Sequence, residues 1–390
     1  MTRIINFTPF ANLRFSNLDA QGNEFGVFMV KTAHDIPAEG PCTLSSEQEP
    51  FVLTDSYFGE LNTSPLRYPS DMVPWKPATD VILDAIAYAP SGQPSAEWQV
   101  GIRIRDAQGM ELEKRLRVTG PREWSGQSGR WQISAPRPVP DLPIRYDLAH
   151  GGILSDGEDK DGQPIMRACE TNPVGCGWLD RAPKRDERNH AAPQISGVDG
   201  SLPDPAREVP PEGFGPIPPA WLPRRSYAGT YDDHWLNEVW PGWPHDYAFR
   251  FHNAAHPDLQ SAGHMRGALS IELTHLHPDR PVWRFSLPDE RPVVVALCEH
   301  GGTTLIELQR DTVFLDIGED AGTDPRVFCV WRTPFDPLNT ESLTVMIRSG
   351  AECDELYGAG QLLRLTPADC ACDPALLDPD VPENPEETTA

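Results

Sequence analysis

Residues 97–119 read EWQVGIRIRDAQGMELEKRLRVT. Apolar and polar residues alternate over 98–104 and again over 110–118, which is the period of a β-strand with one buried face. The turn from Asp106 to Gly109 joins the two runs, so we expect an antiparallel hairpin. Arginines and glutamates occupy the polar face, where we expect cross-strand charge pairs. A charged binding patch is the alternative interpretation of that face.

The same alternation recurs on both sides of the hairpin and predicts further strands. We expect strands at 3–8, 26–32, 51–55, 80–88, 268–277, 282–287, 292–300, 303–318, 326–335 and 342–350. The segment 80–88 is apolar on both faces apart from Asp84, as expected of a strand inside a sheet. Gly301 and Gly302 predict a tight turn between two of the later strands.

The fold class follows from these strands and from the scarcity of helical periodicity. The chain of 390 residues has 42 prolines and 31 glycines, and almost no stretch shows the apolar period of a helix. We therefore expect a mainly β fold of antiparallel sheets, sandwich or barrel-like, with little helix. Long irregular connections rich in proline and glycine should join its strands.

The pattern divides the chain into four parts. We expect an N-terminal β region over 1–145, an irregular connecting segment over 146–225, and a C-terminal β region over 226–372 that packs on the first. Residues 373–390 are acidic and proline-rich, which predicts a disordered tail. The conformation of 153–220 stays open, although Trp178 and Phe214 should anchor parts of the irregular segment to the body.

Charge narrows the classes of partner. Lys and Arg total 33 against 58 Asp and Glu, which gives a formal net charge of −25. This balance argues against nucleic-acid partners and against an anionic membrane surface, both of which require clustered basic side chains. No apolar run resembles a signal peptide or a membrane span. We therefore expect a cytoplasmic protein with reduced cysteines.

A second stretch has an unusual composition. Residues 221–260 read WLPRRSYAGTYDDHWLNEVWPGWPHDYAFRFHNAAHPDLQ, with four tryptophans and several prolines. Proline interrupts helices and central strands because it lacks an amide donor, and the tryptophans require packing partners from elsewhere in the chain. We expect a long structured loop held on a β scaffold.

The sequence offers candidate residues for two kinds of chemistry, metal binding and glycoside hydrolysis. Its eleven histidines show no ligand spacing typical of a metal site, so we expect neither a metal nor a cofactor. Asp232, Asp233 and Asp246 stand near tryptophans, as paired carboxylates do in glycosidases, but sequence spacing does not show that two carboxyl groups face each other. No nucleophile elbow of the GxSxG type is present. A non-enzymatic protein is favoured, and the alternative is a carbohydrate-active enzyme or sugar-binding module.

Taken in order, several motifs resemble one bacterial family that has long been catalogued as a domain of unknown function. They are NFTPF (6–10), VKT (30–32), SPLRYPSDMVPWKPATDVILDAIAYAP (64–90), VTGPREW (118–124), LPIRYDLAHGG (142–152), NPVGCGW (172–178), EGFGP (212–216), WLPRRSYAGTYDDHW (221–235) and PHDYAFRFHNAAHPDLQ (244–260). The resemblance covers about residues 6–288. It departs from the family pattern at His150, where an aromatic residue is expected, and in the APQISG segment near Pro193.

Members of this family are found with type VI secretion systems. The resemblance implies a cytoplasmic adaptor or chaperone that binds an effector protein, typically one with a PAAR domain, and helps to load it onto the VgrG spike. The candidate contact residues are of the types enriched at interfaces or belong to these motifs: Asp71, Lys76, Asp80, Arg122, Trp124, Trp221, Arg225, Tyr231, Asp232, Trp235, Asp246 and Asn253. The alternative for several of them is structural, since buried charges and indoles also fasten loops to a scaffold.

Overall fold

The computed structural model describes residues 2–19, 21–184, 187, 190–199, 204–299, 301–321 and 324–370. Strands make up 43% of the structure and helical turns 11%, which confirms the mainly β prediction. The sheets are antiparallel or mixed, and none of the described sheets closes into a barrel. The predicted tail at 373–390 lies outside the described residues.

The central sheet is mixed, because β8 and β24 run parallel. In spatial order it contains β13 (Asp141–Pro143), β8 (Asp80–Tyr88), β24 (Gln309–Ile317), β25 (Arg326–Phe335), β3 (Glu24–Asp35) and β2 (Ala11–Leu18), with β5 (Thr43–Leu44) paired to β3. Strand β8 is buried on both faces, as predicted for 80–88. This sheet interleaves strands from the predicted N-terminal and C-terminal regions, so the proposed division of the chain stays a prediction.

The second sheet contains the hairpin that decides the fold class. Its spatial order is β19 (Ile195–Gly197), β10 (Glu111–Thr119), β9 (Glu97–Asp106), β20 (Leu269–Thr274), β21 (Val282–Leu287) and β4 (Gly40–Pro41). The hairpin β9–β10 is confirmed, with Gly109 at a φ of 90° in its turn. On its outer face Arg103 pairs with Glu113 and Arg117 with Glu97, both at 2.6 Å, so the predicted charge pairs are confirmed.

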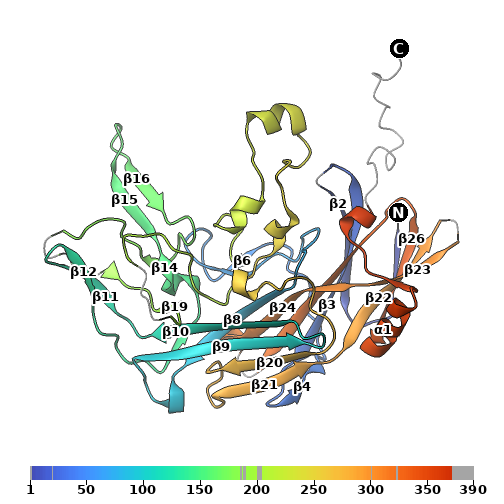
Figure 1. Cartoon of the computed structure of the whole chain (residues 1–390), viewed down its shortest axis with the longest axis horizontal. Helices are drawn as coiled ribbons and strands as arrows, with labels where there is room; N and C mark the ends of the chain where they lie inside the picture. Colours follow the sequence, from blue (N-terminus) through green and yellow to red (C-terminus); the bar gives the residue numbers. More distant parts are fainter. Residues whose placement is uncertain are drawn as a thin grey trace.

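A third sheet lies at the right-hand end of the molecule in Figure 1. It contains β1 (Arg3–Asn6), β26 (Thr340–Ser349), β22 (Glu290–Cys298), β23 (Thr303–Glu307) and β27 (Leu362–Leu363). Helix α1 (Gly350–Gly358) follows β26 and was not predicted. It begins in a capping box, in which the Ser349 side chain accepts from the Glu352 amide and the Glu352 carboxylate accepts from the Ser349 amide.

Short elements complete the described fold. They are β6 (Ser56–Tyr57) with β7 (Leu66–Tyr68), β11 (Glu123–Gln127) with β12 (Arg130–Ile133) and β18 (His190–Ala191), β14 (His150–Gly151) with β17 (Cys176–Gly177), and β15 (Ile153–Glu158) with β16 (Pro164–Ala168). The helical turns are η1 (Pro90–Gly92), η2 (Tyr146–Leu148), η3 (Arg224–Tyr227), η4 (Trp235–Val239), η5 (Phe249–His252), η6 (Pro257–Leu259), η7 (Glu319–Ala321) and η8 (Pro367–Asp369).

Two predictions of local structure were wrong. Residues 51–55 form no strand, because Val52 donates its amide to the Asp71 carboxylate at 2.8 Å instead of to a neighbouring strand. The run 303–318 forms two strands in different sheets, β23 and β24. In 153–220, whose conformation the sequence left open, the structure contains a regular hairpin, β15–β16.

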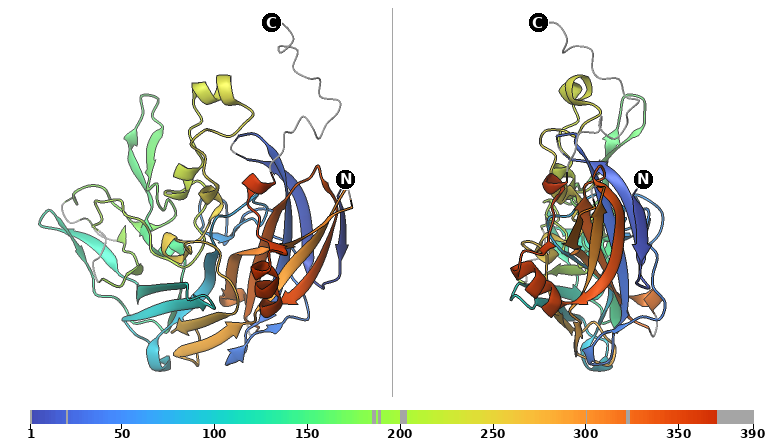
Figure 2. Two further views of the ribbon diagram at one scale, coloured as in Figure 1. Left: turned by 45° about the vertical axis from the view of Figure 1, so that its right-hand side comes forward. Right: turned by 90° about the vertical axis from the view of Figure 1, so that its right-hand side faces the viewer.

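One large hydrophobic core extends through the central and second sheets. Trp178 and Phe214 are buried, which confirms that they anchor parts of the irregular segment. The body is flattened, as the narrow side view shows, and two segments project from one edge of it (Figure 2). In Figure 1 these are the β15–β16 hairpin and the segment around η4. Among the helices of the described ranges, none is long and apolar enough to cross a membrane.

Candidate binding surface

Burial separates the candidate contact residues into two groups. Seven of them are buried or nearly so: Asp71, Lys76, Asp80, Arg122, Trp124, Trp221 and Asn253. The other five lie on or beside the projecting segment and are exposed, with Trp235 half-buried: Arg225, Tyr231, Asp232, Trp235 and Asp246. The stretch 221–260 contributes to both groups.

Asp80 is the centre of the first group. Its carboxylate is fully buried and accepts from Lys76 Nζ at 2.8 Å, from Asn253 Nδ2 at 3.0 Å and from the Ala254 amide at 2.8 Å. Lys76 also donates to Thr312 Oγ1 at 2.9 Å. These bonds connect the start of β8, the neighbouring strand β24 and the end of the stretch 221–260. The side chains of Lys76, Asp80 and Asn253 are all buried, and removal of one of them would leave the charge of another without its partner.

The remaining buried candidates brace the irregular segment. Arg122 donates twice to the Pro193 carbonyl, at 3.0 and 2.8 Å. Trp124 packs in a small cluster with Leu179 and Ala192. The ring of Trp221 stands edge-on to Tyr146, with centroids 5.8 Å apart. These aromatic residues and this arginine therefore contribute to packing and not to an exposed surface.

Asp71 is the last member of the buried group. Its carboxylate forms a 2.9 Å ion pair with Lys31 of β3, and both side chains are largely buried. Its backbone carbonyl accepts from Arg332 of β25 at 2.9 Å. The DMVPWKPATD segment is thus fastened to the central sheet at several points, which agrees with the structural alternative for its candidates.

All the exposed candidates except Arg225 lie on a projecting arm, which we define as residues 228–246. Two bonds close its neck: Asp246 accepts from the Thr230 amide at 2.9 Å and from Thr230 Oγ1 at 2.7 Å. These bonds lower the pKa of Asp246. Near the tip, Asp232 accepts from the Trp235 amide at 2.9 Å, and Trp235 Nε1 donates to the Gly242 carbonyl at 2.9 Å. The arm is therefore held in shape by its own polar side chains.

The arm leaves large apolar groups in solvent. The exposed fractions are 51% for Tyr231, 58% for Leu236 and 64% for Trp240. The Tyr231 ring packs edge-on against Trp235, with centroids 4.7 Å apart. Large apolar side chains grouped on one projection are typical of a protein contact surface. Leu236 and Trp240 were not among the sequence-based candidates, although the run WPGW around Trp240 could have drawn attention to it.

The arm also has one sign of charge. Between Ser226 and Phe249 the sequence has no lysine or arginine, but it has four carboxylates, Asp232, Asp233, Glu238 and Asp246. Arg225 lies outside the arm, where it pairs with Glu170 at 3.0 Å and donates to the Ala220 carbonyl. The exposed apolar groups therefore lie in an acidic setting.

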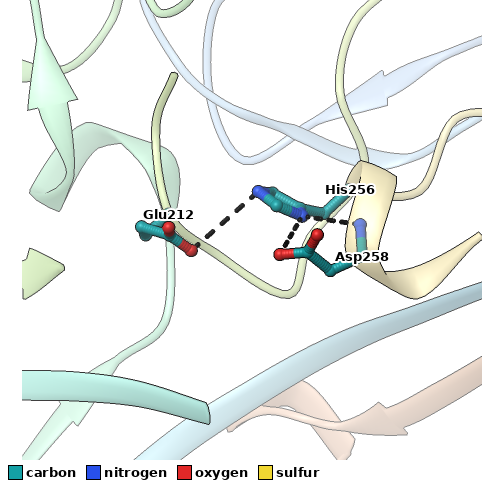
Figure 3. Close-up of side chains that lie close together, drawn as sticks. All are labelled: Glu212, His256 and Asp258. Atoms are coloured by element: carbon teal, nitrogen blue, oxygen red, sulfur yellow. Dashed lines mark hydrogen bonds and ion pairs between the residues drawn. The ribbon is translucent and has the colours of Figure 1, made fainter. Parts of the chain in front are cut away.

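A third arrangement brings together residues that sequence analysis did not connect (Figure 3). Glu212, His256 and Asp258 place their potential ligand atoms within 4.8 Å of one another. Lys114 of β10 already occupies this site, since its ammonium group donates to Glu212 at 2.5 Å and to Asp258 at 2.9 Å. A metal ion would have to displace this buried lysine.

The electrostatics of this cluster agree with a structural role. Burial and the Lys114 charge lower the pKa of His256 to about 4, so its ring is neutral near pH 7. Burial alone would raise the pKa of Asp258, but the hydrogen bond from Lys114 and its charge bring the pKa below its usual value. The cluster joins β10 to the irregular segment and to η6.

Comparison with known proteins places this β scaffold in a family defined by sequence. Residues 21–332 match the model of a family described as uncharacterized protein conserved in bacteria (DUF2169). The chain belongs to this family. The match runs from just before β3 to β25 and thus extends beyond residue 288, where the motif resemblance ends. No curated protein and no solved structure matches the chain.

Proposed function

We propose that this chain is a non-enzymatic adaptor or chaperone that binds a type VI secretion effector with a PAAR domain and helps to load it onto the VgrG spike. The observation that carries the proposal is the arm, with Tyr231, Leu236 and Trp240 each more than half exposed on a projection braced by its own hydrogen bonds. A preorganised aromatic surface of this kind loses little entropy when it binds a protein. The motif resemblance supplies the class of partner.

The charge of the arm specifies the partner surface further. Four carboxylates surround the exposed apolar groups, and no lysine or arginine lies between Ser226 and Phe249. The effector should therefore present an apolar patch bordered by lysine or arginine, because matched charge speeds association and excludes acidic partners. Binding should weaken as salt rises.

The test is a pull-down and a calorimetric titration with a purified PAAR-domain effector of a type VI secretion system. We expect the triple variant Tyr231→Ser, Leu236→Ser, Trp240→Ser to lose at least about thirtyfold in affinity, since the loss of even one hot-spot anchor costs about 2 kcal/mol. The matched control is Ile165→Ser with Met166→Ser, which alters the exposed apolar groups of the other projection. Retained affinity in the arm variant, or an equal loss in the control, would contradict the arm as the contact surface.

A sugar-binding module is the second candidate, because the exposed Tyr231 and Trp240 rings could also stack on sugars. The carboxylates near them argue against hydrolysis, since Asp232 and Asp246 accept hydrogen bonds from the backbone of the arm. Titration with soluble oligosaccharides separates the two functions. Saturable sugar binding that the triple variant abolishes, together with no effector binding, would favour this candidate.

A further inference from the structure

Strand β10 is paired along only part of one edge. On one side it pairs with β9 over its whole length, from Glu111 to Thr119. On the other side it pairs with β19 only from Leu116 to Val118, and β19 ends at Gly197. The first half of β10 therefore forms an edge of the second sheet.

The direction of the backbone groups along this edge follows from the register. The Thr119 amide donates to the Gln194 carbonyl at 2.9 Å, on the β19 side. In an antiparallel ladder every second residue directs its N–H and C=O to the same neighbour, so Glu111, Glu113 and Arg115 also face that side. Within the described ranges no backbone partner is found there for these three residues. The open edge is about 14 Å long.

A cavity of about 510 Å³ lies at this edge. It is lined on one side by 113–115 and at its end by 196–199. Neighbouring residues of a strand point their side chains to opposite faces, so consecutive lining residues present their backbone edge to the cavity. Val209 and Pro210 line it as well. The cavity is a notch in the sheet, at the place where a longer β19 would continue.

Two buried polar groups beside the notch have no partner. His150 and Ser196 both line the cavity and are almost fully buried. His150 Nδ1 and Ser196 Oγ find no hydrogen-bond partner in the structure. Buried polar atoms are nearly always paired in folded proteins, so both atoms keep hydrogen-bonding capacity for a polar group that enters the notch.

The charge of the notch indicates what kind of segment binds. The acidic side chains that line it are Glu113, Asp199, Glu212 and Asp258, and the basic ones are Lys114 and Arg115. Carboxylates outnumber basic groups by four to two, and the Asp258 side chain is 61% exposed. A second copy of this chain would bring two such notches together with like charge, which disfavours pairing between copies.

We propose that an extended segment of the partner, with lysine or arginine side chains, adds to the open edge of β10 as a new strand. Its backbone would bond to Glu111, Glu113 and Arg115, and its basic side chains would lie beside Asp258, whose side chain stays 61% exposed although it pairs with Lys114. Strand addition of this kind obtains affinity from main-chain bonds and specificity from alternate side chains. The inference rests on the proposed function, because it takes the effector as the protein that supplies the segment.

The first test uses the full chain and a short acetylated, amidated peptide of alternating valine and lysine. Hydrogen exchange is measured residue by residue with and without this peptide. We expect slower exchange at the amides of Glu111, Glu113 and Arg115, and no change with the same peptide carrying glutamate in place of lysine. Absence of binding, protection confined to other edges such as β2, or equal protection by both peptides would overturn the proposal.

A pair of variants isolates the backbone contribution. Glu113→Ala removes the side chain and keeps the amide, whereas Glu113→Pro removes the amide as well, at an edge position where proline is tolerated. We expect the proline variant to bind the lysine peptide about tenfold more weakly than the alanine variant, which corresponds to one lost hydrogen bond. Equal affinities in two variants with native circular dichroism would contradict strand addition.

The outcomes separate this inference from the proposed function. If the effector binds through the arm but the amides of β10 stay unprotected in that complex, strand addition is wrong and the adaptor role stands. If the lysine peptide protects β10 but no PAAR effector binds, the adaptor role is wrong and the strand site stands. A dimer in sedimentation that Glu113→Pro abolishes would show that a second copy is the occupant, against the proposal.

Discussion

The stretch 221–260 contains two regions that are both rich in aromatic residues but differ in burial. Its root, which we define as residues 221–227 and 247–260, is mostly fastened into the body, and its arm, residues 228–246, projects from it (Figure 2). In the root, buried Arg224 donates to the carbonyls of Phe251 and Ile217, both at 2.7 Å. In the arm, Trp240 has 64% of its surface exposed. Partners from distant segments decide which aromatic residues are buried, and the local sequence does not.

The largest expected effect concerns the root. Asp80→Ala leaves Lys76 buried without its carboxylate and removes one of the two acceptors of Asn253 Nδ2. We expect the free energy of unfolding to fall by about 3–5 kcal/mol, measured by urea denaturation. A loss below about 1 kcal/mol would show that this ion pair does not hold the root to the central sheet.

The second prediction concerns the loss of folding stability at acid pH. Burial lowers the pKa of His252 to about 3 and that of His256 to about 4, so both rings are neutral in the folded protein. The unfolded chain binds these protons near pH 6.5, so the stability from neutral burial is complete above that pH, declines as pH falls from about 6.5 to the folded-state pKa values, and levels off below them. We expect a loss on the order of a few kcal/mol between pH 7 and pH 4.

The variant His252→Gln sharpens this pH test. Glutamine cannot titrate, so the variant should be less stable at pH 7, where the 2.6 Å contact between Tyr247 Oη and His252 Nε2 is lost, but less sensitive to acid. Melting temperatures at closely spaced pH values provide the comparison. An unchanged acid slope in the variant would exclude His252 as a cause.

The third prediction concerns the lysine that connects the root to β10. Lys114→Met leaves Glu212 and Asp258 without their cation, and because both carboxylates are partly exposed we expect a cost of only about 1 kcal/mol. Zinc should then raise the melting temperature of the variant and not that of the wild type, since Lys114 no longer competes for the ligands. Stabilisation of the wild type by zinc would contradict the structural role of Lys114.

The smallest effect on stability is expected in the arm. The triple variant at Tyr231, Leu236 and Trp240 removes exposed side chains, so the free energy of unfolding should change by about 0.5 kcal/mol or less. Urea denaturation of this variant and of Asp80→Ala compares how much the arm and the root contribute to the free energy of unfolding. A cost comparable to that of Asp80→Ala would mean that the arm packs against the body.

The fold class could be predicted because strand periodicity is a local property. The hairpin β9–β10 and the interior strand β8 follow directly from alternation and from a continuous apolar run. Residues 51–55 have the same apolar character, but the Asp71 carboxylate takes the amide of Val52. That competition depends on a residue 19 positions away, which periodicity does not register.

The candidate surface could be predicted only in part. Interface residue types pointed to the stretch 221–260, but the same types also fasten loops, and the sequence alone could not assign Trp221 to the core and Tyr231 to solvent. The notch at β10 could not be predicted, because it depends on where β19 ends in space. The cluster around Lys114 likewise joins residues from three separate segments.

The most direct test of the account is hydrogen exchange across 221–260, with and without the PAAR effector. In the free protein we predict slow exchange at the hydrogen-bonded amide of Ala254 in the root and fast exchange at the arm tip, around Tyr231 and Trp240. Addition of the effector should slow exchange at the tip and leave the root unchanged. An arm whose exchange is the same in the free protein and in a formed complex would contradict the central claim that the arm is the contact surface.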